Sequence, residues 1–354
     1  MAGPRYSFSA AAGPLPAAVA ATVAEACLDW QGSGSILGLS FVCERFKALQ
    51  RETEIALRRL LAVPQGFRVL FLSGGATAQF AALPFNLLAG GRAVYLDTGH
   101  WSRRARDEAA RHGPVLTLPV AGLAAYDGWL GEEAPAYCHL TSNETADGVQ
   151  WAEVPALPVP LAVDMTSDFL TRPIDFDRVA LAYAGTQKSI GVPGLTVVIL
   201  REDLLGRAAP TTPRVLDYGV QAAADSRVNT PPVFAIFVLH AMLGWIEAQG
   251  GVAAMAAAAR RRSTAVYWAV DENPAYRAWV PPDLRSRINP CFRLADEAAT
   301  AAFLAAAQAE GLHDLKGHPD VGGVRVSLYN GLSDDAVAAL VGFLGAYAAI
   351  GLAA

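Results

Sequence analysis

The chain has few cysteines and few charged residues. Its four cysteines are Cys27, Cys43, Cys138 and Cys291, and they stand far apart without a Cys-x-x-Cys pair. That spacing argues against a zinc site or a disulfide framework, so we predict no metal and a reducing, cytoplasmic setting. Only 17% of the residues are charged, against about 25% in an average soluble domain. This shortage of charge predicts a large buried core or an extensive contact between subunits.

An excess of positive charge is also absent. The formal net charge is −5, so we expect no nucleic-acid partner, and a small anionic substrate would need local cationic groups. The longest apolar run, from 233 to 246, falls short of the ~18 residues that a membrane helix needs, contains His240, and predicts a buried helix. The N-terminal segment is interrupted by Pro4, Pro14 and Pro16 and lacks a basic region before an apolar stretch, so we expect no signal peptide.

Short apolar runs alternate with helical patterns through the first two thirds of the chain. Residues 44–61 predict a long, partly exposed helix, and another helix is expected from about 101 to 112. Buried strands separated by helices are typical of an α/β fold with a mostly parallel sheet that is covered on both faces. Six runs predict such strands: 68–72, 94–97, 138–142, 161–165, 179–184 and 195–200.

The pattern changes from about residue 250. Residues 253–270 predict a long helix. Two strands are expected at 291–295 and 324–330, with an Ala-rich helix between them and a final helix after them. We therefore predict two domains: a large α/β domain of residues 16–250, and a smaller α+β domain of residues 1–15 and 251–354.

Two features that follow predicted strands suit a flat, phosphorylated ligand. Open α/β sheets place their ligands at this edge. Residues 73–77, Ser-Gly-Gly-Ala-Thr, open a helix, and a small-residue turn at a helix N-terminus presents free N–H groups to a phosphate. A simple tight turn is the alternative. Trp101 follows the next strand, where an indole either stacks on a ligand ring or packs in the core.

Asp164 and Lys188 add an acid and an amine to this edge. Asp164 ends a very apolar strand, where a carboxylate needs a partner such as a protonated pyridine nitrogen; an ordinary turn aspartate is the alternative. Lys188 follows the apolar run 179–184, and loss of hydration there would lower its pKa and make it a nucleophile; a solvated lysine is the alternative. Together the four features meet the needs of pyridoxal 5′-phosphate (PLP), which we predict as the cofactor.

Several longer motifs are more specific than these single residues. They include DWQGSGS (29–35), GGATAQFAALPFNLL (74–88), SNETADGVQ (142–150), DMTSDFLTRPID (164–175), YAGTQKSIGVPGLTVVILREDLLG (183–206) and LKGHPDVGGVRVSLYN (315–330). From about 5 to 345 the chain resembles the phosphoserine aminotransferase family of class-V aminotransferases. The resemblance implies a fold-type I PLP-dependent transferase with a mostly parallel seven-stranded sheet. It also implies amino-acid biosynthesis and a homodimer with shared active sites.

The resemblance implies a role for each matching residue. Lys188 would be the catalytic residue and hold PLP covalently, with Asp164 at the pyridine nitrogen and Trp101 stacked on the ring. Arg325 would bind the substrate α-carboxylate, because a planar guanidinium fork suits that group, and His318 would lie on the substrate side. The other implied cofactor contacts are Ala76, Thr77, Thr145, Gln187 and, toward the neighbouring subunit's phosphate, Asn229 and Thr230.

The chain departs from the family pattern where the substrate's phosphate is expected. The family usually has a His-Arg pair, supplied by the partner subunit, where this chain has Phe41 and Val42. It usually has another Arg where this chain has Pro319. Each charge-assisted hydrogen bond lost would be worth ~1.5–3 kcal/mol. We therefore hypothesise an aminotransferase for a non-phosphorylated amino acid or 2-oxo acid, with Phe41 and Val42 lining its substrate pocket. The use of glutamate as the amino donor is in doubt as well.

Three alternatives stay open at this point. In the first, Arg45 or Arg287 replaces the lost charge, and the chain is a 3-phosphoserine:2-oxoglutarate aminotransferase of serine biosynthesis. In the second, the same cofactor serves an elimination or replacement reaction on an amino acid. In the third, the chain is a non-catalytic binding protein, which the complete set of cofactor residues disfavours.

Overall fold

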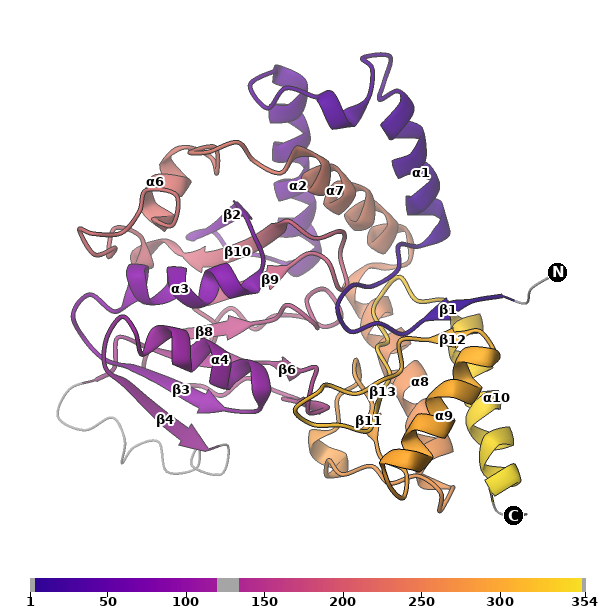
Figure 1. The fold of residues 1–354 in the computed structure, drawn as a ribbon. Helices are drawn as coiled ribbons and strands as arrows, with labels where there is room; N and C mark the ends of the chain where they lie inside the picture. Colours follow the sequence, from indigo (N-terminus) through magenta and orange to yellow (C-terminus); the bar gives the residue numbers. More distant parts are fainter. Residues whose placement is uncertain (1–3, 120–133, 352–354) are drawn as a thin grey trace.

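A sheet of seven strands forms the centre of the molecule (Figure 1). The computed structural model describes residues 4–119 and 134–351. Every pair of neighbouring strands is parallel except the two pairs that include the strand 195–201. The strands stand in the order β2 (Phe67–Ser73), β10 (Leu195–Arg201), β9 (Leu181–Gly185), β8 (Leu161–Asp164), β5 (Tyr137–Thr141), β3 (Ala93–Asp97) and β4 (Val115–Pro119).

The sequence predicts six of these seven strands within a few residues, and it misses β4. This strand lies at the edge of the sheet and pairs only with β3. Its residues are half-buried or exposed, and it ends in Pro119, so it lacks the continuous apolar run of the central strands. The mostly parallel, seven-stranded α/β sheet is confirmed.

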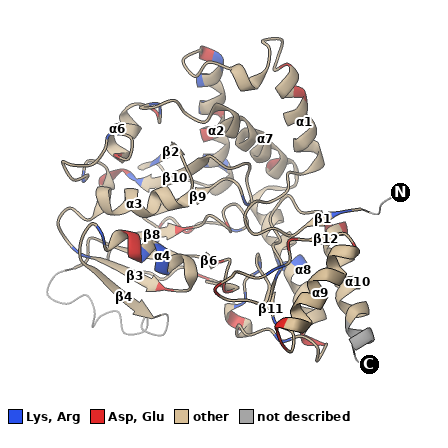
Figure 2. Ribbon diagram, in the orientation of Figure 1, with Lys and Arg blue, Asp and Glu red and all other residues tan. Residues whose placement is uncertain are grey.

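Helices cover both faces of the sheet (Figure 1), and their apolar faces form two separate core clusters with the strands. The predicted helix 44–61 is confirmed to the residue, and the run from 233 begins a helix whose apolar side chains are mostly buried. Figure 2 shows the charged residues mainly on helices and near strand ends. One face carries α1 (Ala17–Leu28), α2 (Glu44–Leu61) and α7 (Val233–Ala248); the other carries α3 (Ala76–Leu87), α4 (His100–Ala109) and α6 (Tyr218–Ala223).

The C-terminal part has its own apolar cluster, which includes Phe292 and Phe303. The first strand, β1 (Tyr6–Ser7), joins this part by pairing in parallel with β12 (Leu312–His313). The predicted division into domains near residue 250 stays a prediction. The remaining elements are α8 (Gly251–Asp271), β11 (Cys291–Phe292), α9 (Glu297–Ala309), β13 (Val324–Arg325), α10 (Asp334–Gly351), and the hairpin of β6 (Asn143–Glu144) and β7 (Val149–Gln150).

The strands predicted at 291–295 and 324–330 are shorter than expected, because only two residues of each form a ladder, as β11 and β13. Backbone bonds continue irregularly from Val326 to the carbonyl of Pro290, and proline has no N–H with which to extend a ladder. Among the described residues, no single helix is long and apolar enough to span a membrane. The helices α7 and α8 reach that length and apolar composition only when taken together, and the chain bends by 81° between them.

Candidate active site

Lys188 lies in a turn just after β9, and its side chain is buried. Its Nζ lies 5.5 Å from the centroid of the Trp101 ring. Among the described residues it has no hydrogen bond and no salt bridge. Burial lowers the pKa of Lys188 to about 8, with Asp164 opposing the shift and Arg325 adding to it. A buried amine without a hydrogen-bond partner and with a lowered pKa is suited to act as a nucleophile.

Asp164 is the last residue of β8, and only 5% of its surface is exposed. Its Oδ1 accepts a hydrogen bond of 2.9 Å from the backbone N–H of Thr166. Burial raises the pKa of Asp164, while the bonds from Thr166 and the nearby Lys188 oppose that change. A carboxylate this deeply buried is stable as an anion only beside a cation, and a protonated ring nitrogen meets that need.

The turn after β2 is shaped to hold an anion. Gly74 adopts a φ of +106°, and its N–H and carbonyl bond to Gly194 and Thr196 of the neighbouring strand region. Helix α3 begins at Ala76, so the N–H groups of Ala76 and Thr77 in its first turn lack helical partners. Such a helix N-terminus suits an anion, and the binding of a phosphate here stays a prediction.

Trp101 is held in place by an acid that the sequence reasoning missed. Glu144 is fully buried and accepts hydrogen bonds of 2.8 Å from the backbone N–H groups of Trp101 and Ser102. Burial raises the pKa of Glu144 to about 7, and these bonds oppose the shift. The indole Nε1 donates to Oγ1 of Thr145 at 2.8 Å. The sequence signal was weak: Glu144 is simply the one acid between 138 and 146.

Two further segments close around Lys188. Arg325 of β13 donates from Nη1 to the carbonyl of Thr145 at 3.2 Å, so its guanidinium stands next to the support of the indole. Gly13 donates to the carbonyl of Gln187 at 2.9 Å. A Cβ at Gly13 would lie 2.0 Å from the carbonyl oxygen of Lys188, so only glycine fits there. The N-terminal segment is thus a wall of the site, in agreement with the family resemblance, which implies that residues 9–15 lie near the substrate.

Two histidines and an aspartate form a cluster beside Trp101. The His100 ring stands edge-on to the indole, with centroids 5.1 Å apart, and packs on the His318 ring at 4.1 Å. Oδ2 of Asp320 lies 3.1 Å from Nδ1 of His100, and the Asp320 backbone N–H donates to Nδ1 of His318 at 3.3 Å. Burial, and then His318, lower the pKa of His100. These side chains are of types that bind metals, but both Nδ1 atoms already have partners within the cluster.

Some predicted site residues are not brought to Lys188 within one chain. Phe41 packs against the core cluster of α1, α2 and α7, and Val42 is 63% exposed. Asn229 donates to Oγ of Ser73, beside the phosphate turn of its own chain, at 3.2 Å. The predicted contributions of Phe41, Val42, Asn229 and Thr230 to a neighbouring subunit's site stay predictions.

The lowered pKa of Lys188 predicts how the cofactor-free protein takes up PLP. The neutral amine is the nucleophile, so the rate of uptake is expected to rise with pH through about 8 and then level off. Absorbance-monitored mixing at a series of pH values measures this rate. A rate that keeps climbing toward the ordinary lysine value of about 10.5 would contradict the burial effect.

Comparisons with known proteins agree with this geometry. The family model described as aminotransferase class-V matches residues 5–340. The curated phosphoserine aminotransferase of Aromatoleum aromaticum is 46% identical, with 96% of this chain and 97% of that protein covered. The crystal structure of PLP-bound phosphoserine aminotransferase from Trichomonas vaginalis is 37% identical, with a TM-score of 0.91 and coverage of 96% of this chain and 99% of that one. An alanine–glyoxylate aminotransferase from Nostoc, at 21% identity and a TM-score of 0.77 over 98% of this chain and 96% of that one, shares the fold.

Proposed function

The chain belongs to the phosphoserine aminotransferase family of the class-V aminotransferases. Within this family, we propose that it transaminates an amino acid without a phosphate group. It is a PLP-dependent transaminase. The residues fit the cofactor: the partnerless buried amine of Lys188, the buried carboxylate of Asp164 and the open helix N-terminus at Ala76 suit an aldehyde, a protonated ring nitrogen and a phosphate. When bound, PLP supplies an electron sink for the substrate's Cα.

The chain's own residues would then bind the substrate and move its proton. Arg325 lies near enough to Lys188 to lower its pKa and offers a planar fork for the α-carboxylate. The Lys188 amine would accept the proton of the substrate's Cα and return it, as a general base and acid. Asp164 would favour the protonated ring nitrogen through its buried negative charge.

The observation that carries the substrate proposal is the His100–His318–Asp320 cluster. It stands beside the indole that is expected to support the cofactor ring. The pKa of His100 is lowered, which favours its neutral imidazole, and the carboxylate of Asp320 lies next to it. A carboxylate in this position suits a neutral or cationic side chain better than a dianionic phosphate.

A second candidate is the transamination of phosphoserine. The relatives that carry this name are 41–46% identical over nearly the whole chain. Arg104 supports it as well, because its guanidinium lies 5.2 Å from the centroid of the Trp101 ring and could meet a phosphate there.

Titration of the PLP-loaded enzyme separates the two candidates. L-phosphoserine, L-glutamate, and neutral and cationic amino acids would be added in turn while the cofactor's absorption is followed. We expect a neutral or cationic amino acid to convert the cofactor at a lower concentration than phosphoserine does. Conversion by micromolar phosphoserine and glutamate would instead assign the chain to serine biosynthesis.

Replacing Arg325 by alanine is expected to weaken binding of the amino acid found in that titration. Loss of a charge-assisted fork removes roughly 1.5–3 kcal/mol, which corresponds to about a 10- to 150-fold rise in KM. Arg325→Lys keeps the charge but loses the fork, so its KM should lie between those of the parent enzyme and the Arg325→Ala variant. An unchanged KM in Arg325→Ala, measured by steady-state kinetics, would remove Arg325 from the carboxylate site.

We also propose that the chain is a cytoplasmic homodimer. The support for a dimer, besides the resemblance, is apolar surface on and between α1 and α2, where Leu28, Leu37, Val42 and Ile55 are 57–84% exposed. Large exposed apolar side chains gathered on one region mark contact surfaces. Light scattering in solution should give twice the chain mass of 37.2 kDa, and a monomer at high concentration would refute the dimer.

A further inference from the structure

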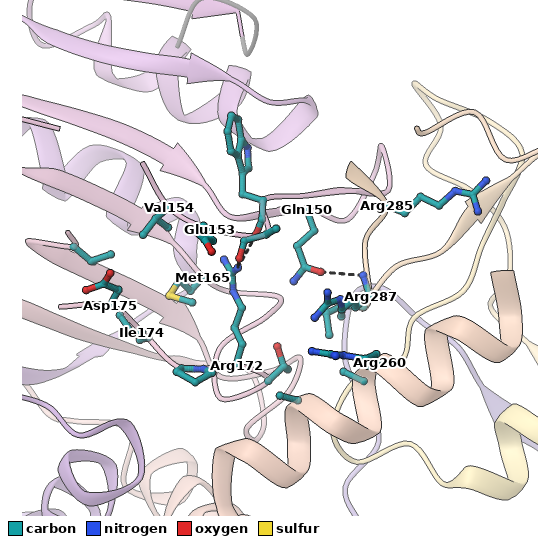
Figure 3. Close-up of a pocket in the computed structure, with 18 of the residues that line it drawn as sticks. Gln150, Glu153, Val154, Met165, Arg172, Ile174, Asp175, Arg260, Arg285 and Arg287 are labelled. Atoms are coloured by element: carbon teal, nitrogen blue, oxygen red, sulfur yellow. Dashed lines mark hydrogen bonds between the residues drawn. The ribbon is translucent and has the colours of Figure 1, made fainter. Parts of the chain in front are cut away.

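A cleft of about 690 Å³ lies between the sheet and α8 (Figure 3). Met165 and residues of four segments line it: 150–154 from the end of β7, 171–179 after β8, 256–260 of α8, and 282–288. Lys188, Trp101 and the other residues assigned to the cofactor are not among its lining. A volume of this size falls in the range of roughly 300–1,000 Å³ that is typical of small-molecule sites.

Five arginines line the cleft, and three of them are paired with acids. Arg178 lies 3.1 Å from Asp175, Arg285 lies 2.6 Å from Asp271, and Arg172 lies 3.1 Å from the buried Asp168, measured between nitrogen and oxygen. The carboxylates of Asp175, Asp271 and Asp168 are therefore already engaged by these three arginines. The two other arginines are Arg260, from α8, and Arg287.

Arg260 and Arg287 have no acidic partner. Within residues 4–119 and 134–351, neither side chain has a hydrogen bond or a salt bridge. The backbone N–H of Arg287 donates to Oε1 of Gln150 at 2.9 Å. Figure 3 shows both guanidinium groups directed into the cleft, with Arg172 across from them. The pKa of Arg287 is lowered first by burial and then by the positive charges of Arg260 and Arg172. The exposed Arg260 and Arg287, together with Arg172, therefore bring positive charge to one space. Arg172 is already paired with Asp168, and Glu153, Asp175 and Asp283 also line the cleft.

We propose that this cleft binds a phosphate monoester of a small organic molecule, with its phosphate between Arg260, Arg287 and Arg172. Guanidinium forks match the oxygens of a phosphate in charge and in geometry. The wall next to them is apolar, with Met165, Ile174 and Ile288 among its residues, so it can hold the organic part of the ligand. The proposal uses neither Arg325 nor any residue assigned to the cofactor, and Arg287, which the sequence left open as a ligand of the substrate's phosphate, lines this cleft instead.

The cleft is connected to the cofactor edge by buried hydrogen bonds. Gln150, which holds Arg287, donates from Nε2 to Asp168 at 3.1 Å, and Asp168 also accepts from Oγ of Ser142. The same Oγ lies 3.0 Å from the carbonyl oxygen of Asp164. A ligand in the cleft therefore contacts a network that ends at the residue placed beside the ring nitrogen.

Calorimetric titration of the PLP-loaded enzyme tests the proposal. The probes are glycerol 3-phosphate and inorganic phosphate, with sulfate and chloride at matched ionic strength as controls. We expect Arg260→Gln and Arg287→Gln each to weaken binding of glycerol 3-phosphate about tenfold, or about 1.4 kcal/mol. Arg261→Gln is the matched control on the same helix, since Arg261 instead pairs with Asp334 at 2.7 Å, and it should bind normally. Turnover without added phosphate should be unchanged in all three variants.

The arms of the experiment distinguish the possible ligands. Tighter binding of the ester than of inorganic phosphate supports a ligand with an organic body, and equal binding supports the phosphate group alone as the ligand. Equal binding of sulfate and chloride would reduce the site to a counterion surface and overturn the proposal. Binding that survives in the Arg260→Gln/Arg287→Gln double variant but is lost in Arg325→Ala would place the phosphate in the substrate site. That result would also overturn the proposal, and it would favour phosphoserine as substrate.

Discussion

Replacing Lys188 by alanine is expected to abolish transamination while leaving the protein folded. Removal of an essential nucleophile costs on the order of a millionfold in rate. The variant should also lose PLP on desalting, because no covalent bond would hold the cofactor. Absorption spectra before and after desalting, together with an assay at high enzyme concentration, measure both effects.

The Lys188→Ala variant should remain folded. The Lys188 amine has no hydrogen-bond partner among the described residues, and burial disfavours its charge. Its removal therefore breaks no hydrogen bond and relieves a desolvated cation, while Asp164 loses the nearby positive charge that lowers its pKa. Thermal unfolding of the cofactor-free proteins makes the comparison. Lys47→Ala, at an exposed ion pair with Glu44, is the control with normal activity. Turnover that persists in Lys188→Ala would refute its catalytic role.

Replacing Asp164 by asparagine is expected to have the second-largest effect. The amide has nearly the same shape but no charge, so the ring nitrogen would lose the partner that keeps it protonated. Breaking a buried ion pair typically costs about 3–5 kcal/mol, which predicts a fall in turnover of about two to three and a half orders of magnitude. The pKa of Lys188 should fall further as well, because Asp164 opposes its lowering.

Two measurements test the Asp164 prediction. Steady-state kinetics gives the loss of turnover, and the pH dependence of PLP uptake by the cofactor-free variant gives the shift in the pKa of Lys188. Asp97→Asn is a matched control, since Asp97 also ends a strand of the sheet but is paired with the exposed Arg103 at 3.1 Å. An Asp164→Asn variant with near-normal turnover would show that the buried carboxylate is structural.

Much of the fold could be predicted from local pattern, because central strands and long helices carry strong periodic signals. The predicted helix 44–61 matches α2 to the residue. Elements that depend on distant partners could not be predicted as well. The burial of the edge strand β4 alternates weakly. The strand β13 lies opposite Pro290 beyond Arg325, and after β11 the residue Arg293 pairs with Arg277 instead of with β13. These outcomes depend on tertiary neighbours rather than on local propensity.

The candidate site also contains residues that local sequence pattern predicts and contacts that it does not predict. Lys188, Asp164 and the turn at Ala76 follow buried strands, so their positions carried a signal in the sequence. The contacts of Gly13 with Lys188 and of His100 with Asp320 join segments that are far apart in the chain. A single sequence contains no spacing rule for such pairs, and only the three-dimensional structure brings them together.

The pairing of β1 with β12 has a consequence for synthesis. Tyr6 of β1 pairs with Leu312 of β12, and the segment that follows β1 forms the wall against Lys188 through Gly13. A growing chain therefore releases Tyr6 from the ribosome long before its partner Leu312 exists. The central sheet can form earlier, because all its strands lie before residue 202. The wall over the lysine is thus anchored only after the sheet that carries the lysine is complete.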